Sequence, residues 1–205
     1  MKIFKIAIVV LLFFINLMVA QPSFAGKKLA ENPDYIEVSQ ALDSLLQDKE
    51  TQGATPENAL KIANLQFQKY ILETGKGKGV CRNETGTTLL VYGQKNKKSK
   101  STYDNALYLL PNGQETDDEW DCDGVYVPSN LKVTGIADGQ ELVTPIAYKI
   151  VDGTKLVAKS NPETSAIEFN VPPSQVFKTS EVNWFIPDTI QAVLDTGISN
   201  APIDD

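Results

Sequence analysis

A run of short apolar segments separated by turn signals, residues 131–171, constrains the fold of this chain more than any other feature. Asp138-Gly139 and Asp152-Gly153 are dipeptides that favour the two-residue turns of β-hairpins. Residues 161–164, Asn-Pro-Glu-Thr, indicate a longer turn. The segments around these turns are the expected strands, 132–137, 141–151, 154–159 and 165–171. The sequence therefore predicts a four-stranded antiparallel β-meander.

The region 26–78 has helical rather than strand periodicity. Pro33 occupies an N1-like position, and Thr55-Pro56-Glu57 combines a capping hydroxyl, a proline at N1 and an acid in the first turn. The expected apolar faces carry Tyr35, Val38, Leu42 and Leu45 in the first helix and Leu60, Ala63, Phe67 and Ile71 in the second. A polar stretch at 47–53 is expected to end the first helix, and Gly75 the second. We predict a helical hairpin whose apolar faces lie on another part of the chain.

The remaining segments indicate further strands and one short helix. Residues 87–92, 106–110 and 182–186 have the composition of strands, and 188–197 begins with a capping-box pattern typical of a short helix. We predict an α+β chain in which the helical hairpin packs on an antiparallel β-sandwich or open barrel, with a short C-terminal helix. The expected divisions are a signal peptide at 1–25, the hairpin at 26–78 and the β domain at 79–205.

The first 25 residues have the pattern of an export signal. Two lysines precede an apolar run at 6–20, which is shorter than the roughly 20 residues that a membrane-spanning helix needs. Ser23 and Ala25 fit a signal-peptidase site, with an uncleaved anchor as the alternative. We expect export to the periplasm or the medium, or to a thylakoid-type lumen, with no stable membrane span after cleavage. The charge changes from −7 to −9 when 1–25 is removed, which argues against a nucleic-acid partner.

The only two cysteines, Cys81 and Cys122, are predicted to form a disulfide, because an exported chain meets an oxidising compartment. A loop of 41 residues closed in this way is stabilised by about 4 kcal/mol in the chain-entropy model. A redox dithiol is the alternative, although the C-x-x-C spacing typical of such pairs is missing.

The chain contains no histidine, which excludes several classes of enzyme chemistry. Serine and cysteine hydrolases with an imidazole base, His-ligated zinc and haem with a proximal histidine all need that side chain. Two cysteines are also too few for a four-thiolate zinc site or an iron–sulfur cluster. We therefore expect a non-catalytic protein without a cofactor, and keep a hydrolase that uses carboxylates alone as an alternative.

The densest candidate for a binding site is the acidic run at 117–124. Glu119, Asp121 and Asp123 followed by Gly124 are close to the opening of a calcium loop, in which alternate oxygens converge and glycine permits the turn. The twelfth position would be Asn130 rather than a bidentate glutamate, so an EF-hand is not expected. A looser calcium or small-ligand site remains a hypothesis beside that of a solvated acidic loop.

One segment of this acidic chain is strongly basic. Lys95, Lys97, Lys98 and Lys100 lie between two expected strands, where they form either a solvated hairpin tip or a patch for an acidic partner. Our leading hypothesis is an exported, non-catalytic protein that binds a protein partner in an oxidising compartment outside the cytoplasm. The calcium or small-ligand module and the carboxylate-only hydrolase are the second and third hypotheses.

Overall fold

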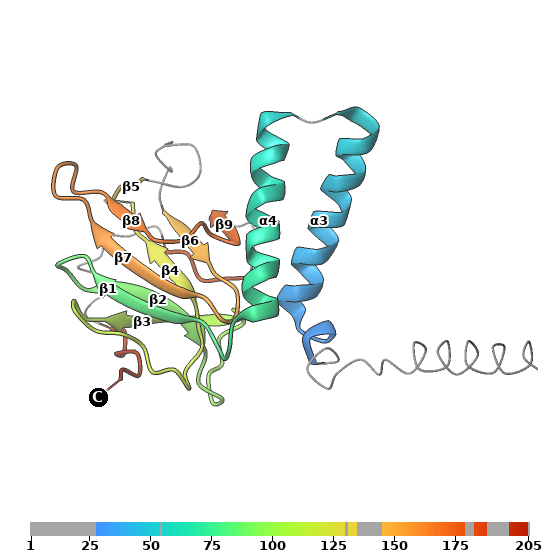
Figure 1. Ribbon diagram of the computed structural model, residues 1–205. Helices are drawn as coiled ribbons and strands as arrows, with labels where there is room; N and C mark the ends of the chain where they lie inside the picture. The colour runs from blue at the N-terminus through green and yellow to red at the C-terminus, as the bar shows by residue number, and fades with distance from the viewer. Residues whose placement is uncertain are drawn as a thin grey trace, which may run out of the picture.

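The computed structural model describes residues 28–53, 55–129, 131–134, 145–178, 183–187 and 197–204. Within these residues two long helices are followed by short strands in two sheets (Figure 1). The helices are α3 (Pro33–Gln52) and α4 (Pro56–Thr74). The strands are β1 (Val80–Glu84), β2 (Leu89–Gln94), β3 (Asn105–Leu110), β4 (Cys122–Val127), β5 (Val133–Thr134), β6 (Ile146–Lys149), β7 (Lys155–Ser160), β8 (Ile167–Phe169) and β9 (Gln175–Lys178). The expected helical N-terminal region followed by a β-rich region is confirmed, whereas the predicted signal peptide at 1–25 lies outside the described residues.

Helix α3 begins at the expected proline. The side chain of Asn32 caps it by accepting a hydrogen bond from the backbone N–H of Tyr35 at 3.0 Å. The helix ends within the predicted polar stretch 47–53, at its last residue, because α3 continues to Gln52 and stops at Gly53, which has a φ of 86°. Polar residues that face solvent do not interrupt a helix, and a glycine in a left-handed conformation does.

Helix α4 begins and ends as predicted. The Thr55 side chain accepts a hydrogen bond from the backbone N–H of Asn58 at 3.2 Å, and a proline occupies the first turn. At the other end the Gly75 N–H donates to the carbonyl of Ile71. Both boundaries of α4 follow from local capping chemistry.

The buried face of α3 is the predicted one, but that of α4 is not. Val38 and Leu42 of α3 are buried. On α4 the buried side chains are Ile62, Gln68 and Leu72. The expected Leu60 and Phe67 are instead 44% and 41% exposed. The prediction missed the buried face of α4 because that face contains a polar residue, Gln68. The Gln68 amide is satisfied in the interior by donating a hydrogen bond to the Pro173 carbonyl at 2.9 Å.

The strands form a four-stranded sheet, in the order β1-β7-β8-β5, and a five-stranded sheet, in the order β3-β2-β4-β6-β9. The four-stranded sheet is mixed, because β1 pairs with β7 and β5 pairs with β8 in parallel. Every pairing in the five-stranded sheet is antiparallel. The prediction of one antiparallel meander was therefore wrong, since β6 belongs to one sheet and its sequence neighbours β5, β7 and β8 to the other.

The Asp152-Gly153 turn explains this error. A turn forms there, with a φ of 78° at Gly153 and a hydrogen bond from the Thr154 N–H to the Val151 carbonyl at 3.2 Å, but it is not the expected hairpin turn, because β6 and β7 do not pair. The strands before and after the turn enter different sheets. Strand β6 is buried between β4 and β9 in the five-stranded sheet, and β7 pairs with the edge strand β1 in the four-stranded sheet. A turn fixes the local reversal of the chain, but strand partners are decided by burial. The other expected turn, Asp138-Gly139, lies outside the described residues.

The main core lies between the two sheets. Leu156 and Ile167 of the four-stranded sheet belong to one buried cluster with Val91, Val125 and Tyr148 of the five-stranded sheet. The opposite face of the five-stranded sheet carries a second cluster that includes Leu90, Tyr92 and Tyr126. Because this sheet is covered on both faces, β2 is a continuous apolar run rather than an alternating one.

The predicted disulfide between Cys81 and Cys122 is confirmed. It joins β1 of the four-stranded sheet to β4 of the five-stranded sheet, with 5.9 Å between the Cα atoms. Both cysteines are 1% exposed, so the bond lies within the core and closes one end of it.

The expected strand at 182–186 is not formed by its described residues, 183–186. This segment lies across the second face of the five-stranded sheet, where the Tyr92 hydroxyl donates to the Phe185 carbonyl at 2.8 Å. The Tyr126 hydroxyl donates to the Pro187 carbonyl in the same way. Tyrosine hydroxyls thus take the place of a strand partner, which sequence periodicity does not reveal. Residues 188–196 of the expected C-terminal helix lie outside the described residues.

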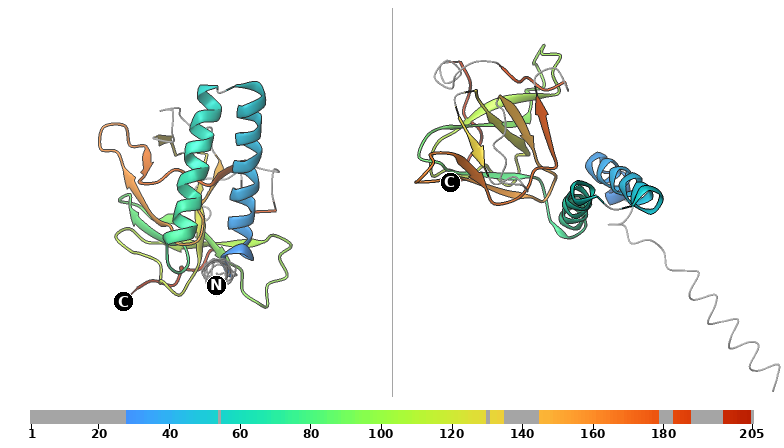
Figure 2. Two further views of the ribbon diagram at one scale, coloured as in Figure 1. Left: turned by 45° about the vertical axis from the view of Figure 1, so that its right-hand side comes forward. Right: turned by 90° about the horizontal axis from the view of Figure 1, so that it is seen from above.

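The helices stand at one side of the β domain, with α4 nearer to it than α3 (Figures 1 and 2). Neither of these described helices is long and apolar enough to cross a membrane.

Candidate functional site

Two hollows flank the start of β3, the edge strand of the five-stranded sheet, and Asn105 lines both. The first, which we name the acidic cleft, has a volume of about 330 Å³ and is lined by Lys78, Gln94, Asp104, Asn105, Glu119, Trp120, Asp121 and Asp123. The second, the apolar pocket, has a volume of about 320 Å³ and is lined by Ser101, Tyr103, Asn105, Ala106, Leu107, Phe185 and Ile198. The lysine loop, residues 95–104, joins β2 to β3 and contributes to both hollows. Their volumes are in the range of small ligand sites.

The lysine loop is ordered by its own hydrogen bonds. The Lys95 ammonium donates to the carbonyls of Ser101 and Tyr103 at 3.1 and 2.6 Å, which closes the loop across its base. Asn183 attaches the loop to the β domain, because its amide donates to the Thr102 carbonyl at 2.9 Å and to the Asp104 carboxylate at 3.0 Å. Lys95 is thus a structural member of the loop.

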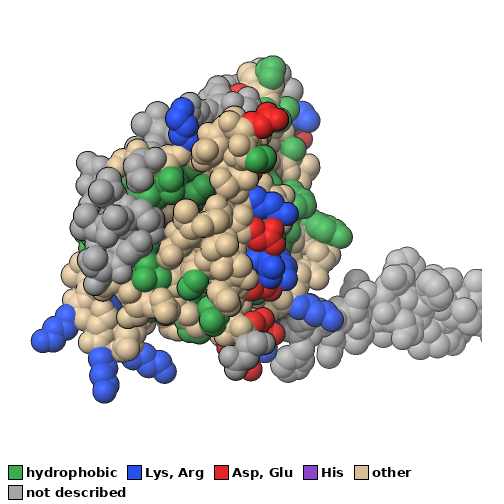
Figure 3. All heavy atoms as spheres, turned by 90° about the vertical axis from the view of Figure 1, so that its left-hand side faces the viewer, with side chains coloured by type: hydrophobic (Ala, Val, Ile, Leu, Met, Phe, Trp, Pro, Cys, Tyr) green, Lys and Arg blue, Asp and Glu red, His purple; other side chains and the backbone are tan. Residues whose placement is uncertain are grey.

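The other three lysines of the loop are available to a partner. Lys97, Lys98 and Lys100 are exposed, and they take part in no ion pair among the described residues. Figure 3 shows basic side chains projecting at one end of the molecule, whereas elsewhere on that face acidic and basic side chains alternate in a column. Ion pairs of this kind occur on β1 and β7. The Arg82 guanidinium lies 2.7 Å from the Glu84 carboxylate within β1, and Lys159 of β7 lies 3.1 Å from the same carboxylate. The lysine loop thus places three positive charges close together that no ion pair among the described residues neutralises.

The apolar pocket lies at the base of the lysine loop. The rings of Tyr103, from the loop, and Phe185 lie 5.3 Å apart between centroids and are each 39% exposed. Leu107 of β3 and Ile198 complete its apolar wall. Partly exposed aromatic rings beside unpaired cations provide both an apolar anchor and a charged rim.

Close backbone packing shapes the acidic cleft. Gly93 permits the Trp120 ring to lie against β2, since a Cβ at that position would meet the ring at 2.1 Å. The pairing of β2 with β4 shifts register next to Gly93, because Tyr92 pairs with Gly124 and Gly93 pairs with Cys122. Asp123 is the extra residue at this irregularity. Asp121 accepts a hydrogen bond from the Gly79 N–H at 3.1 Å. The cleft is thus built where β2, β4 and the segment before β1 meet.

Burial and neighbouring carboxylates raise the pKa values of Asp121, which directly precedes β4, and of Asp123 within β4. Burial raises the pKa of Asp123 to about 7, and the charges of Asp121, Asp34 and Asp152 add to this effect, while Lys149 opposes it. Burial also raises the pKa of Asp121, with a smaller contribution from Asp152. Asp123 nevertheless has a donor, since the Asn105 amide donates to its carboxylate at 2.9 Å. The Asp123 carboxyl group can therefore hold a proton near neutral pH.

The three residues predicted to bind calcium line one cleft but do not form a tight ligand set. Glu119, Asp121 and Asp123 all face the acidic cleft. Among the described residues, the group of three carboxylates whose oxygens lie within 4.8 Å of one another is instead Asp117, Asp118 and Asp204. That group is largely exposed, and such acidic groups are common without an ion. Calcium binding stays a prediction.

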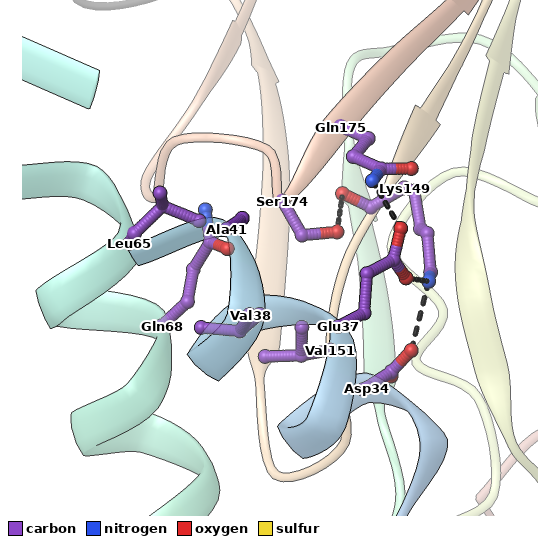
Figure 4. Close-up of a pocket in the computed structure, with 10 residues that line it drawn as sticks. All are labelled: Asp34, Glu37, Val38, Ala41, Leu65, Gln68, Lys149, Val151, Ser174 and Gln175. Atoms are coloured by element: carbon purple, nitrogen blue, oxygen red, sulfur yellow. Dashed lines mark hydrogen bonds and ion pairs between the residues drawn. The ribbon is translucent and has the colours of Figure 1, made fainter. Parts of the chain in front are cut away.

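A polar seam joins the start of α3 to the β domain, beside the acidic cleft (Figure 4). Lys149 of β6 lies 2.8 Å from the Asp34 carboxylate and 3.2 Å from that of Glu37. Gln175 of β9 donates to the same Glu37 carboxylate. Figure 4 shows these side chains converging above the apolar contact of Val38 with the β domain. The seam therefore positions the hairpin and supplies charges that act on Asp123.

Sequence reasoning identified the carboxylates and the lysines but missed their surroundings. Phe185 was expected only as part of the strand 182–186, and Lys149 only as part of the strand 141–151. The one available signal was Tyr103, an aromatic residue three positions after Lys100. The others come from distant segments, and their proximity depends on the sheet order.

No protein-family model, no curated protein and no solved structure matches this chain. The function must therefore be inferred from the geometry of the molecule itself.

Proposed function

We propose that this protein is an exported, non-catalytic binding protein that holds an acidic segment of a protein partner at the lysine loop and the apolar pocket. The observation that carries the proposal is the position of three exposed, unpaired lysines beside a pocket with exposed aromatic rings. Charge provides orientation and association rate, and the apolar anchor provides most of the affinity.

The charge distribution supports an acidic partner. The whole chain carries a net charge of −7, yet Lys97, Lys98 and Lys100 extend from one loop. An acidic segment is repelled by most of the surface and attracted at this loop, so it approaches in one orientation. The Lys95 hydrogen bonds keep the loop closed before binding, which reduces the entropy lost on association.

The apolar pocket supports a partner segment that also contains a large apolar side chain. Tyr103 and Phe185 are large apolar residues held in place yet 39% exposed. Residues of this kind are frequent at the energetic centre of protein interfaces. The expected ligand is therefore an acidic segment with one aromatic or aliphatic anchor.

The proposed location is an oxidising compartment outside the cytoplasm, either the periplasm, the medium or a thylakoid-type lumen. The buried disulfide is consistent with it. The proposed architecture is a two-sheet β-sandwich with the helical hairpin at its side, supported by the core shared between the sheets.

The test uses a fluorescent ten-residue peptide of aspartate and glutamate with one central phenylalanine, titrated by fluorescence polarisation. The triple substitution Lys97→Glu, Lys98→Glu and Lys100→Glu is expected to weaken binding at least tenfold. Phe185→Ala is expected to weaken it by a similar factor without removing its salt dependence, because only the anchor is lost.

The matched control carries the same charge change elsewhere, at the exposed Lys28, Lys49 and Lys76. It is expected to change the affinity less than threefold. Equal losses of peptide affinity in both triple variants would show that net charge alone causes the effect, which would overturn the role of the lysine loop. If the unsubstituted protein does not bind the peptide, the whole proposal is overturned.

A second candidate, a calcium or small-ligand module, is favoured by the volume of the acidic cleft and by Asp121 and Asp123 within it. Calorimetric titration with calcium chloride tests it, and no heat and no change in melting temperature at millimolar calcium would remove it. The raised pKa of Asp123 keeps the carboxylate-only hydrolase as a third candidate. Activity in a hydrolase panel that disappears in Asp121→Asn and Asp123→Asn would reveal it.

A further inference from the structure

The outer face of α4 is apolar along the length of the helix. Leu60, Phe67 and Tyr70 are 44%, 41% and 60% exposed, and Ala63 between them is also exposed. These four residues follow one another at intervals of three, four and three, which aligns them in one stripe. The stripe lies opposite the face of α4 that packs against the rest of the molecule.

The outer face of α3 has the ordinary composition of a solvated helix. Gln40, Asp43 and Gln47 are exposed there, and Ile36 is its one large apolar residue that is more than a third exposed. The two helices are neighbours of similar length, so solvent exposure alone does not account for the apolar stripe of α4. An exposed apolar face that spans a helix typically marks an interaction site.

The spacing of the stripe is self-complementary. Its members are symmetric about Leu65, since Leu60 and Tyr70 are equally distant from it, as are Ala63 and Phe67. If two α4 helices pack antiparallel about a two-fold axis at this point, each small or medium residue lies opposite a large ring. Leu60 then faces Tyr70 of the second copy, and Ala63 faces Phe67 of the second copy. This is the a-to-d layering of an antiparallel coiled coil.

We infer that the stripe is a homodimer interface, occupied by α4 of a second copy of this chain. No charged residue interrupts the stripe, so nothing on it favours a charged partner. The contact is isologous, as in most two-fold dimers, and involves a single helix from each copy. A single helix from each copy makes a small contact beside the roughly 800 Å² per partner of a standard interface, so we expect a weak dimer that dissociates on dilution.

Sedimentation equilibrium of the purified protein between micromolar and millimolar concentration tests the inference. A monomer–dimer equilibrium is expected for the unsubstituted chain, and Phe67→Asp is expected to weaken it at least tenfold. Gln40→Asp places the same charge on the exposed outer face of α3 and is the matched control, with a change of less than twofold.

A pair of substitutions distinguishes pairing of α4 with itself from other contacts. Ala63→Phe alone places two rings opposite each other and is expected to weaken the dimer, whereas adding Phe67→Ala restores one small and one large residue in each layer and with it the dimer. A protein that stays monomeric near millimolar concentration, a dimer insensitive to Phe67→Asp, or no recovery in the double variant would overturn the inference. Circular dichroism verifies that each variant keeps its helices.

Discussion

The β domain and the helical hairpin are held in different ways. The β domain has a core enclosed by two sheets, a buried disulfide and residues such as Val91 and Tyr126 with no exposed surface. The hairpin buries few side chains and meets the β domain at a polar seam around Lys149. The stability of this molecule therefore resides mainly in the β domain, and the outer surface of the hairpin is left for other contacts.

The largest expected effect comes from removing the disulfide. Cys81→Ser with Cys122→Ser is expected to lower the free energy of unfolding by about 4 kcal/mol, since the bond closes a loop of 41 residues. Both tryptophans, Trp120 and Trp184, lie in the β domain, so their fluorescence in a denaturant titration reports this region. Circular dichroism at 222 nm reports mainly the helices. A helical transition that shifts as far as the fluorescence transition would contradict a division into two stability regions.

The next largest effect is expected at Asn83, a buried polar residue of the β domain. Its amide donates to the carbonyls of Thr87 and Leu110 at 2.7 Å each and accepts from both the N–H and the hydroxyl of Thr85. Asn83→Ala leaves these groups without partners and is expected to cost about 3 kcal/mol in a denaturant titration. Asn64→Ala on α4, at a site without such bonds, is the control and is expected to change stability by less than about 0.5 kcal/mol.

Asp123→Asn is expected to stabilise the protein in a pH-dependent manner. The pKa of Asp123 is about 7 in the folded chain and lower in the unfolded chain, where the ordinary value is 3.8. The folded state therefore binds the proton more tightly, and stability falls as pH rises from about 4 to about 7. Asparagine removes the buried charge, so the gain is about 2 kcal/mol at pH 8 and near zero at pH 4. Thermal melts at both pH values check this, and an equal gain at both, or the same gain in the exposed control Glu119→Gln, contradicts it.

The smallest effect is expected at the seam. Lys149→Met keeps the length of the side chain but leaves Asp34 and Glu37 without their cation, at a cost of about 1 kcal/mol. Hydrogen exchange is expected to accelerate in the first turns of α3 and to stay unchanged in β2 and β4. Lys155→Met removes an exposed ion pair with Glu115 and serves as the control, with no change in the exchange of α3. Faster exchange throughout the β domain would show that the two regions unfold together.

Local signals predicted the parts of the fold that local chemistry controls. The start of α3 at a proline, the Thr55 cap and the Gly75 end of α4 depend on residues within one helical turn of each boundary. The chain also reverses at Asp152-Gly153, although this turn does not close a hairpin. These features need no knowledge of the rest of the chain.

Strand partners could not be predicted in this way. Residues on either side of Asp152-Gly153 enter different sheets, since β6 needs burial on both faces and β1, about 70 residues earlier, takes the edge of β7. The apolar run at Trp184 and Phe185 looks like a strand, yet tyrosine hydroxyls of the sheet bind its carbonyls instead. Strand β4 was missed because its first residues, Cys122 and Asp123, read as the end of an acidic loop.

The candidate site shows the same division. The lysines of 95–100 and the acids of 117–124 are visible in the sequence as charge clusters. Their different roles are not, because Lys95 is distinguished from Lys97 only by the carbonyls that it reaches across the loop. Asp123 differs from Glu119 through burial and through carboxylates contributed by α3 and the turn after β6.

The two helices, their caps, the single disulfide and the absence of imidazole chemistry follow from residue identity or from neighbours along the chain. The order of the strands, the pocket beside the lysine loop, the raised pKa of Asp123 and the exposed stripe of α4 arise from tertiary packing. Each of these depends on which distant segments exclude water from a given side chain, and that exclusion exists only once the sheets and the hairpin have packed.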